Sequence, residues 1–201
     1  MSSRFLAQCK QYAPRSIRGF GLIELMVSIS IMLLVAAVVL ARQDSFNGAV
    51  LLRGEAYEVA LGAREVQLNS VSAISIAGNY RTLVGLHFDT NNDALVRIFK
   101  DSAGGNGSYN SGEEFGKPLT IDSRFEVRGI RTVSGNTETP ISNLSVVFVR
   151  PNFDARFFNS TAGEIFASRV EIDISKRDQT GTTTDVVRTV EITSTGQIAV
   201  Q

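Results

Sequence analysis

The chain has 201 residues, of which 43% are hydrophobic and 20% are charged, and this composition is typical of a folded protein. Its 20 basic and 20 acidic residues balance, but the first 19 residues hold four basic residues and no acidic ones, so the remainder carries a net charge of about −4. A mildly acidic body without a cluster of Lys and Arg argues against nucleic-acid binding. The single cysteine, Cys9, excludes an intrachain disulfide.

An apolar segment, Phe20 to Ala41, contains one charged residue, Glu24. As a helix it would span roughly 33 Å, which is enough to cross a bilayer core of about 30 Å. The sequence therefore predicts a membrane-spanning helix over residues 20–41. The basic residues that precede this helix favour the cytoplasmic side, so everything after Arg42 is expected to lie outside the cytoplasm.

Apolar residues continue at helical spacing beyond the predicted membrane segment. They recur at intervals of four and three residues, at Leu52, Ala56, Val59, Ala63 and Val66. This spacing predicts an amphipathic second half of the helix over residues 42–72, ending near Val71, with these five side chains on one face.

Beyond Asn79 the apolar period changes to two, which predicts a β domain over residues 79–201. The predicted strands are 83–88, 95–99, 125–133, 144–149, 170–174, 186–192 and 198–200. In the segment 170–175, Val and Ile alternate with polar residues, so one face of the sheet should be buried and the other wet. The expected fold is α+β, with one long N-terminal helix packed on an antiparallel sheet or sandwich.

The start of the apolar segment carries a recognisable motif. The residues Arg18-Gly19-Phe20-Gly21-Leu22-Ile23-Glu24-Leu25 resemble the cleavage and methylation motif of type IV pilins and type II secretion pseudopilins, whose usual form is basic-Gly-Phe-Thr-Leu-Ile-Glu-Leu. The sequence departs from this form only at Gly21, a position that the family lets vary. The resemblance implies that residues 1–19 are a leader, that a prepilin peptidase cuts after Gly19, and that Phe20 becomes a methylated N-terminus.

Glu24 is the predicted assembly residue. Insertion of a carboxylate into a membrane as part of a helix costs about 2.5 to 3.5 kcal/mol on insertion scales. Glu24 is therefore expected to have a charged partner or a function. The resemblance implies that it meets the N-terminal amine of an adjacent subunit. The alternative is that the carboxylate snorkels to the lipid headgroups near the helix end.

The resemblance implies a structural subunit of a type IV pilus or a type II secretion-like filament, and not an enzyme. Its expected partners are the prepilin peptidase, sibling pilin subunits, an inner-membrane assembly platform and the membrane itself. The chain would first lie in the inner membrane and then enter an extracellular or periplasmic filament. The glycine- and serine-rich loop after the second strand and two segments, Arg150 to Asp154 and Ser194 to Ile198, look like those of the minor pseudopilin H group and related minor pilins. The resemblance leaves open whether the filament is a pilus or a secretion filament, and whether this subunit is a major or a minor one.

Two other interpretations compete with the pilin one. Val39-Leu40-Ala41 loosely fits the cleavage site of a secretory signal peptide, although the apolar run is longer than such peptides usually have. The chain would then be a secreted or membrane-tethered β-domain binding module, with calcium-dependent binding as one form of it.

A glycine-rich segment, residues 101–114, resembles loops found in many pseudopilins. Its oxygen-bearing side chains could gather around Ca²⁺, and the candidate ligands are Asp101, Asn106, Asn110, Glu113 and Glu114. The alternative is a surface loop without a metal. His87 is the only histidine, and with no second His or Cys outside the leader it is expected to be a surface or half-buried strand residue.

Overall fold

The structure is a computed structural model that describes residues 19, 21–72, 82–101, 105–150, 152–177 and 186–201, with the backbone alone for residues 42–46. The chain divides between Asp44 and Ser45 into two compact units. The helix α1 (Leu22–Val71) runs through this division, and its last residue agrees with the predicted end.

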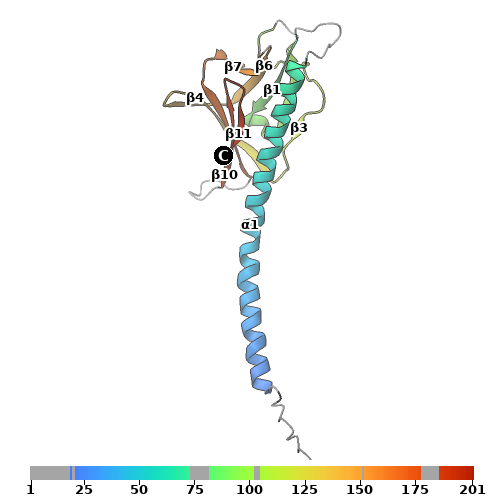
Figure 1. Ribbon diagram of the computed structural model, residues 1–201, viewed down its shortest axis with the longest axis vertical. Helices are drawn as coiled ribbons and strands as arrows, with labels where there is room; N and C mark the ends of the chain where they lie inside the picture. Colours follow the sequence, from blue (N-terminus) through green and yellow to red (C-terminus); the bar gives the residue numbers. More distant parts are fainter. Residues whose placement is uncertain (1–18, 20, 73–81, 102–104, 151, 178–185) are drawn as a thin grey trace, which may run out of the picture. The chain divides into compact units, whose positions relative to one another are not determined.

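Two antiparallel sheets make up the β domain (Figure 1). One sheet has the strand order β3-β2-β1-β6-β7-β8 and the other has the order β11-β10-β9-β4-β5. A short 3-10 helix, η1 (Thr90–Asn92), follows the first strand. The strands are β1 (Leu83–Asp89), β2 (Leu95–Asp101), β3 (Leu119–Thr120), β4 (Phe125–Ser134), β5 (Thr137–Ile141), β6 (Asn143–Val149), β7 (Asp154–Asn159), β8 (Gly163–Ile165), β9 (Arg169–Lys176), β10 (Val187–Thr193) and β11 (Ile198–Val200). The apolar helix and the antiparallel sheets confirm the α+β class.

The second part of α1 helps to form the domain core. All five side chains predicted to share one face are buried, and they pack in one cluster with apolar residues of both sheets. Figure 1 shows this part of the helix beside β1, β3 and β11. Individual contacts show that the helix lies against β3 and β11. A Cβ on Gly62 would meet Leu119 of β3, and Arg64 Nη2 donates a 3.0 Å hydrogen bond to the carbonyl of Ile198 in β11.

Polar side chains near the C-terminal end of α1 fasten it to strand ends. Ser70 Oγ shares its proton between the carbonyls of Val84 and Phe148, at 3.1 and 3.0 Å. Gln67 Nε2 donates to the carbonyl of Gly196 at 2.8 Å. Both side chains are buried, so these bonds satisfy groups that would otherwise destabilise the core.

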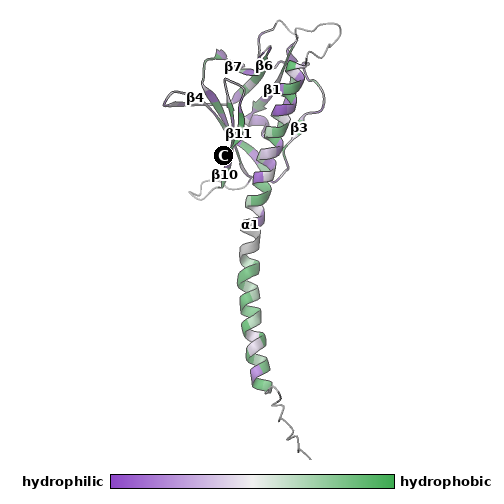
Figure 2. Ribbon diagram, in the orientation of Figure 1, coloured by the Kyte–Doolittle hydropathy of each residue, from purple (hydrophilic) through white to green (hydrophobic). Residues whose placement is uncertain are grey.

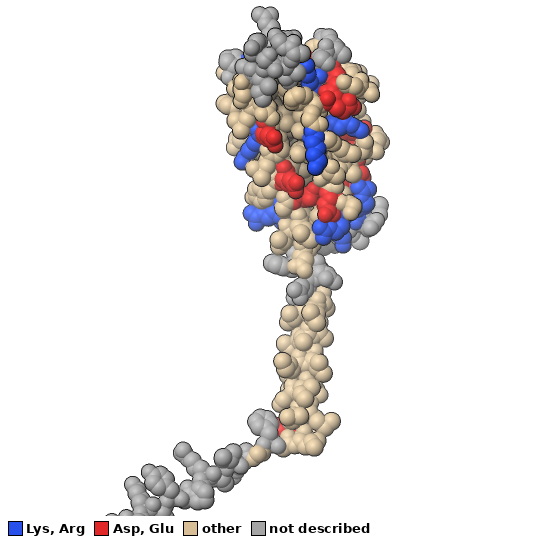
Figure 3. Space-filling view, turned by 90° about the vertical axis from the view of Figure 1, so that its right-hand side faces the viewer, with Lys and Arg blue, Asp and Glu red and all other residues tan. Residues whose placement is uncertain are grey.

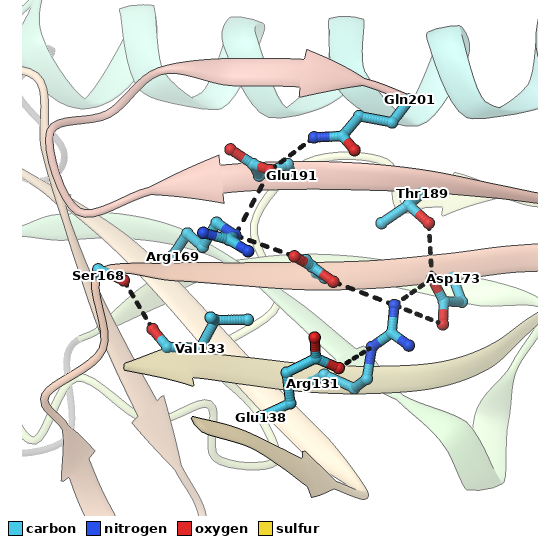
Figure 4. A network of polar contacts seen from close by, with 10 residues as sticks. Arg131, Val133, Glu138, Ser168, Arg169, Asp173, Thr189, Glu191 and Gln201 are labelled. Atoms are coloured by element: carbon cyan, nitrogen blue, oxygen red, sulfur yellow. Dashed lines mark hydrogen bonds and ion pairs between the residues drawn. The ribbon is translucent and has the colours of Figure 1, made fainter. Parts of the chain in front are cut away.

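The five-stranded sheet has one apolar and one charged face. Val170, Ile172 and Ile174 of β9 are fully buried, as the alternation predicts. The other face holds a network of ion pairs in which Arg131 reaches Glu171 at 3.0 Å and Asp173 at 3.2 Å (Figure 4). Ser175 was expected on this wet face but is fully buried, because it lies in register between the longer side chains of Glu126 and Val187.

Candidate functional site

The helix α1 begins at the motif. Gly19 and Gly21 lie before the first helical residue, Leu22, whereas Phe20 falls outside the described residues. The carbonyl of Gly21 accepts hydrogen bonds from the backbone amides of Glu24 and Leu25, at 3.0 and 3.1 Å. Gly21 therefore occupies the N-cap position of α1, where its carbonyl accepts the first hydrogen bonds of the helix.

Glu24 lies in the first turn of α1 with its side chain exposed. The partial positive charge at a helix N-terminus favours a carboxylate there. The two serines of the apolar segment are satisfied within the helix, because Ser28 Oγ donates to the carbonyl of Glu24 at 2.7 Å and Ser30 Oγ to that of Met26 at 2.8 Å. In residues 22–41, the Glu24 carboxylate is thus the polar side-chain group to which the helix offers no partner.

The apolar side chains of Leu22–Ala41 are all exposed, and this stretch is long and apolar enough to cross a membrane (Figure 2). Acidic and basic side chains are interspersed on the face of the β domain that Figure 3 shows, while the apolar stretch is almost free of charge. Exposed apolar surface of this extent requires a cover, whether lipid or other protein chains.

A second exposed apolar stripe lies on α1 within the β-domain unit, and the sequence analysis missed it. Its side chains are Val50, Tyr57, Leu61 and Leu68, with exposed fractions of 54%, 45%, 61% and 58%. At about 100° per residue these positions fall on one line, roughly opposite the buried face of the helix. Their spacing of seven, four and seven residues is readable in the sequence, but the apolar pattern of the buried face, with steps of four and three residues, is the stronger of the two.

The stripe is bordered by opposite charges. Glu58 and Glu65 lie on one side of it, and Arg53 and Arg64 lie on the other, all with exposed side chains. The guanidinium of Arg53 rests over the ring of Tyr57, 5.5 Å from the centroid. In the described part of the chain, neither Glu58 nor Glu65 forms an ion pair.

The loop after β2 brings some of the predicted calcium ligands together and separates others. Asn110 donates from its backbone to Glu113 Oε2 at 2.9 Å and from its side chain to Asn106 Oδ1 at 3.5 Å. Asp101 is buried and accepts from the amide of Gly107 at 2.8 Å.

The last of the five, Glu114, turns away to Gly112 N and the hydroxyl of Tyr109. Glu113, Glu114 and Asp101 Oδ2 thus accept from N–H or O–H donors within the loop, whereas Asp101 Oδ1 is buried without a hydrogen-bond partner among the described residues. Among the described residues, no three His, Cys, Asp or Glu side chains gather closely enough to hold a metal ion. Calcium binding by the five residues stays a prediction.

The same loop covers one face of the six-stranded sheet. Tyr109 stacks on His87, with ring centroids 4.8 Å apart, and donates its backbone N–H to Ser145 Oγ at 3.1 Å. His87 is therefore buried, not at the surface or half-buried as expected from its strand. Burial lowers the pKa of His87 to about 4, while the nearby Asp89 raises it and Arg97 lowers it further, each with a smaller effect. Sequence alone did not indicate that the loop folds back over the strand.

The comparison with known families agrees with the motif. Residues 14–40 match the family model described as the prokaryotic N-terminal methylation motif. This match covers a short part of the chain, and it supports a pilin-type precursor that a prepilin peptidase processes. No curated protein and no solved structure matches the chain significantly.

The calcium prediction can be tested by melting the full chain in detergent with millimolar Ca²⁺ and with a chelator. A ligand at a hundredfold excess over its dissociation constant stabilises the folded state by about 2.7 kcal/mol, which corresponds to a rise of several degrees. Asp101→Asn should abolish the rise, whereas Glu138→Gln, on the opposite sheet, should preserve it. Equal melting temperatures with and without Ca²⁺ would show that the loop does not bind Ca²⁺.

Burial of His87 should make the β domain sensitive to acid. Its folded pKa of about 4 lies below the ordinary 6.5, so the folded state favours the neutral ring. Above pH 6.5 the ring is neutral in both states, and His87 does not change the free energy of unfolding. Between pH 6.5 and about 4 the unfolded state takes up the proton more readily, so the free energy of unfolding falls by roughly 3 kcal/mol. In denaturant unfolding of the full chain, His87→Asn should flatten the decline over this window relative to wild type. If wild type and His87→Asn lose the same free energy of unfolding between pH 7 and pH 4.5, the acid sensitivity does not come from His87.

Proposed function

We propose that this chain is the precursor of a type IV pilin-like subunit, which is processed at Gly19–Phe20 and assembles through α1 into a filament. The observation that carries the proposal is the combination of the methylation motif with a helix whose apolar side chains are all exposed from Leu22 to Ala41. Lipid can cover this surface before assembly, and neighbouring copies of the same helix can cover it afterwards. In this function the chain undergoes chemistry and performs none.

The carboxylate of Glu24 indicates that the apolar segment has a role in assembly as well as in anchoring. A purely lipid-facing segment would be more stable without a carboxylate, because insertion of the charge costs about 2.5 to 3.5 kcal/mol. The helix supplies no partner for it, whereas a free N-terminal amine on Phe20 of a neighbour would supply one. Pairing of this kind would place each new subunit at a defined height in the filament.

The finer likeness to the minor pseudopilin H group has a weaker basis. Arg150 donates to the carbonyl of Ser70, and the carbonyl of Gly196 accepts from Gln67. These two of the segments that carry the likeness thus hold α1 against the sheets. Packing accounts for these residues, so the proposal is held at the level of a pilin or pseudopilin subunit.

Processing is tested by producing the full chain with a prepilin peptidase and measuring the intact mass of the product. The mature chain should begin at Phe20 and carry one added methyl group. Gly19→Leu should leave the precursor uncut, whereas Gly21→Ala should be processed normally. A Cβ at Gly19 meets no atom within 4 Å and one at Gly21 meets only Ile23 at 4.0 Å, so neither substitution disturbs the fold. A mature chain that begins at Arg42 would instead establish a secreted module.

Recruitment is tested with Glu24→Gln, which keeps the shape of the side chain and removes its charge. The variant should be processed and inserted like wild type, because an amide is cheaper to place in a membrane. Its share in sheared filaments should fall about tenfold or more, since the neighbour's amine loses its partner. Glu138→Gln, on the outer edge of the β domain, is the matched control and should be recruited normally. Normal recruitment of Glu24→Gln would refute the pairing.

A further inference from the structure

A groove lies between α1 and the segment 115–120, which leads into β3 and forms it (Figure 1). Its volume is about 510 Å³. The lining residues come from the helix, from β1 and β2 and from this segment, and they are Glu58, Glu65, Asn69, Val84, Ile98 and 115–120. Hollows of roughly 300–1,000 Å³ that combine apolar walls with a few polar groups are the usual form of small-molecule sites.

The helix side of the groove has a carboxylate on each side of an apolar centre. Glu58, Gly62 and Glu65 follow one another at steps of four and three residues, so they lie on one face of α1. Because Gly62 has no side chain, Leu119 of β3 occupies the space between the two glutamates. Ile98 and Phe115 are half-buried beside it and continue the apolar wall.

The two carboxylates are available to a ligand. Glu58 and Glu65 are exposed, and neither forms an ion pair among the described residues. Lys117 is the basic residue of the lining, and it too is exposed and forms no ion pair in the described part of the chain. Two negative charges against one positive charge leave the groove suited to a cation.

The separation of the carboxylates defines the shape of that cation. Seven residues of helix place Glu58 and Glu65 roughly 10 Å apart along the axis of α1, which is too far for both to coordinate one metal ion. A ligand with a positive charge at each end satisfies both. An extended chain of single bonds advances roughly 1.2 Å per bond, so about nine bonds between two ammonium groups span the distance.

We propose that this groove binds an elongated aliphatic diammonium ligand of the polyamine class. One ammonium group lies at Glu58 and the other at Glu65, and the methylene groups between them cover Leu119 and its apolar neighbours. Lys117 repels small inorganic cations, which gain nothing from the apolar wall. The inference does not depend on the filament function, because the groove lies wholly within the unit Ser45–Gln201.

The first test compares two diamines of equal charge by calorimetric titration into the full chain in nonionic detergent at low ionic strength. Diaminooctane, with an amine at each end, has the required length, whereas putrescine is about half as long. Diaminooctane should bind about fivefold more tightly or better, because putrescine does not reach both carboxylates at once. Spermidine, a polyamine of similar length, should compete with diaminooctane for the groove.

Substitutions locate the binding. Glu58→Gln and Glu65→Gln should each weaken diaminooctane binding about fivefold, and either one should abolish the preference over putrescine. Lys117→Met keeps the apolar stem and removes the opposing charge, so it should strengthen binding about threefold. Glu138→Gln, which removes the same charge from β5, is the matched control and should bind like wild type.

The dependence on ligand length is the decisive result, since diffuse attraction between an acidic surface and a dication does not depend on chain length. Equal affinities for the two diamines would overturn the proposal, as would Glu138→Gln weakening binding as much as Glu58→Gln does. Absence of measurable binding by both diaminooctane and spermidine would overturn it too, and would leave the groove as a solvent-filled surface feature.

Discussion

Burial of one face of α1 in the β domain determines what the rest of the helix can do. Small residues let the helix approach the sheets closely, and Gly62 leaves space that Leu119 occupies. Gln67 and Ser70 then fasten the helix to strand ends, so its rotation about its own axis is defined by buried hydrogen bonds. With rotation defined, the outward face is defined too, and the stripe of Val50, Tyr57, Leu61 and Leu68 stays exposed.

Much of the fold could be predicted because its patterns are local. The helix end at Val71, the five buried helix positions and the main strands follow from spacing alone. Four strands, β3, β5, β7 and β8, were not predicted. β3 and β8 are too short to show a period, β5 is polar and contains Pro140, and β7 lies beside a Pro-Asn turn signal. Their pairing depends on neighbours that are distant in sequence, which a local pattern does not contain.

The candidate site also has features that the sequence indicates and features that it does not. The roles proposed for Gly19, Phe20 and Glu24 could be inferred from the sequence because they depend on a contiguous motif at the start of an apolar run. The surroundings of His87 were not, because Tyr109 reaches it from a loop 22 residues further along the chain. Of the predicted calcium ligands, Asn106, Asn110 and Glu113 lie together in the structure, and backbone N–H groups of the loop donate to Asp101, Glu113 and Glu114. Glycine-rich chains offer many such amides, and residue type alone does not show which donor each carboxylate takes.

The outer face of the five-stranded sheet differs from α1 in how its charges are paired. Its arginines and carboxylates form a mutually neutralising network, in which Arg169 joins Glu171 at 2.9 Å and Glu191 at 3.6 Å (Figure 4). Charges that are satisfied within the domain have little left to offer a partner, and exposed ion pairs add little stability. On α1 the situation is the reverse, since Glu24, Glu58 and Glu65 lack ion-pair partners among the described residues. Apolar contact area gives affinity but tolerates sliding, whereas unpaired charges at definite heights penalise every wrong register. A subunit of the proposed filament needs both properties on one element, and α1 is the element on which they coincide.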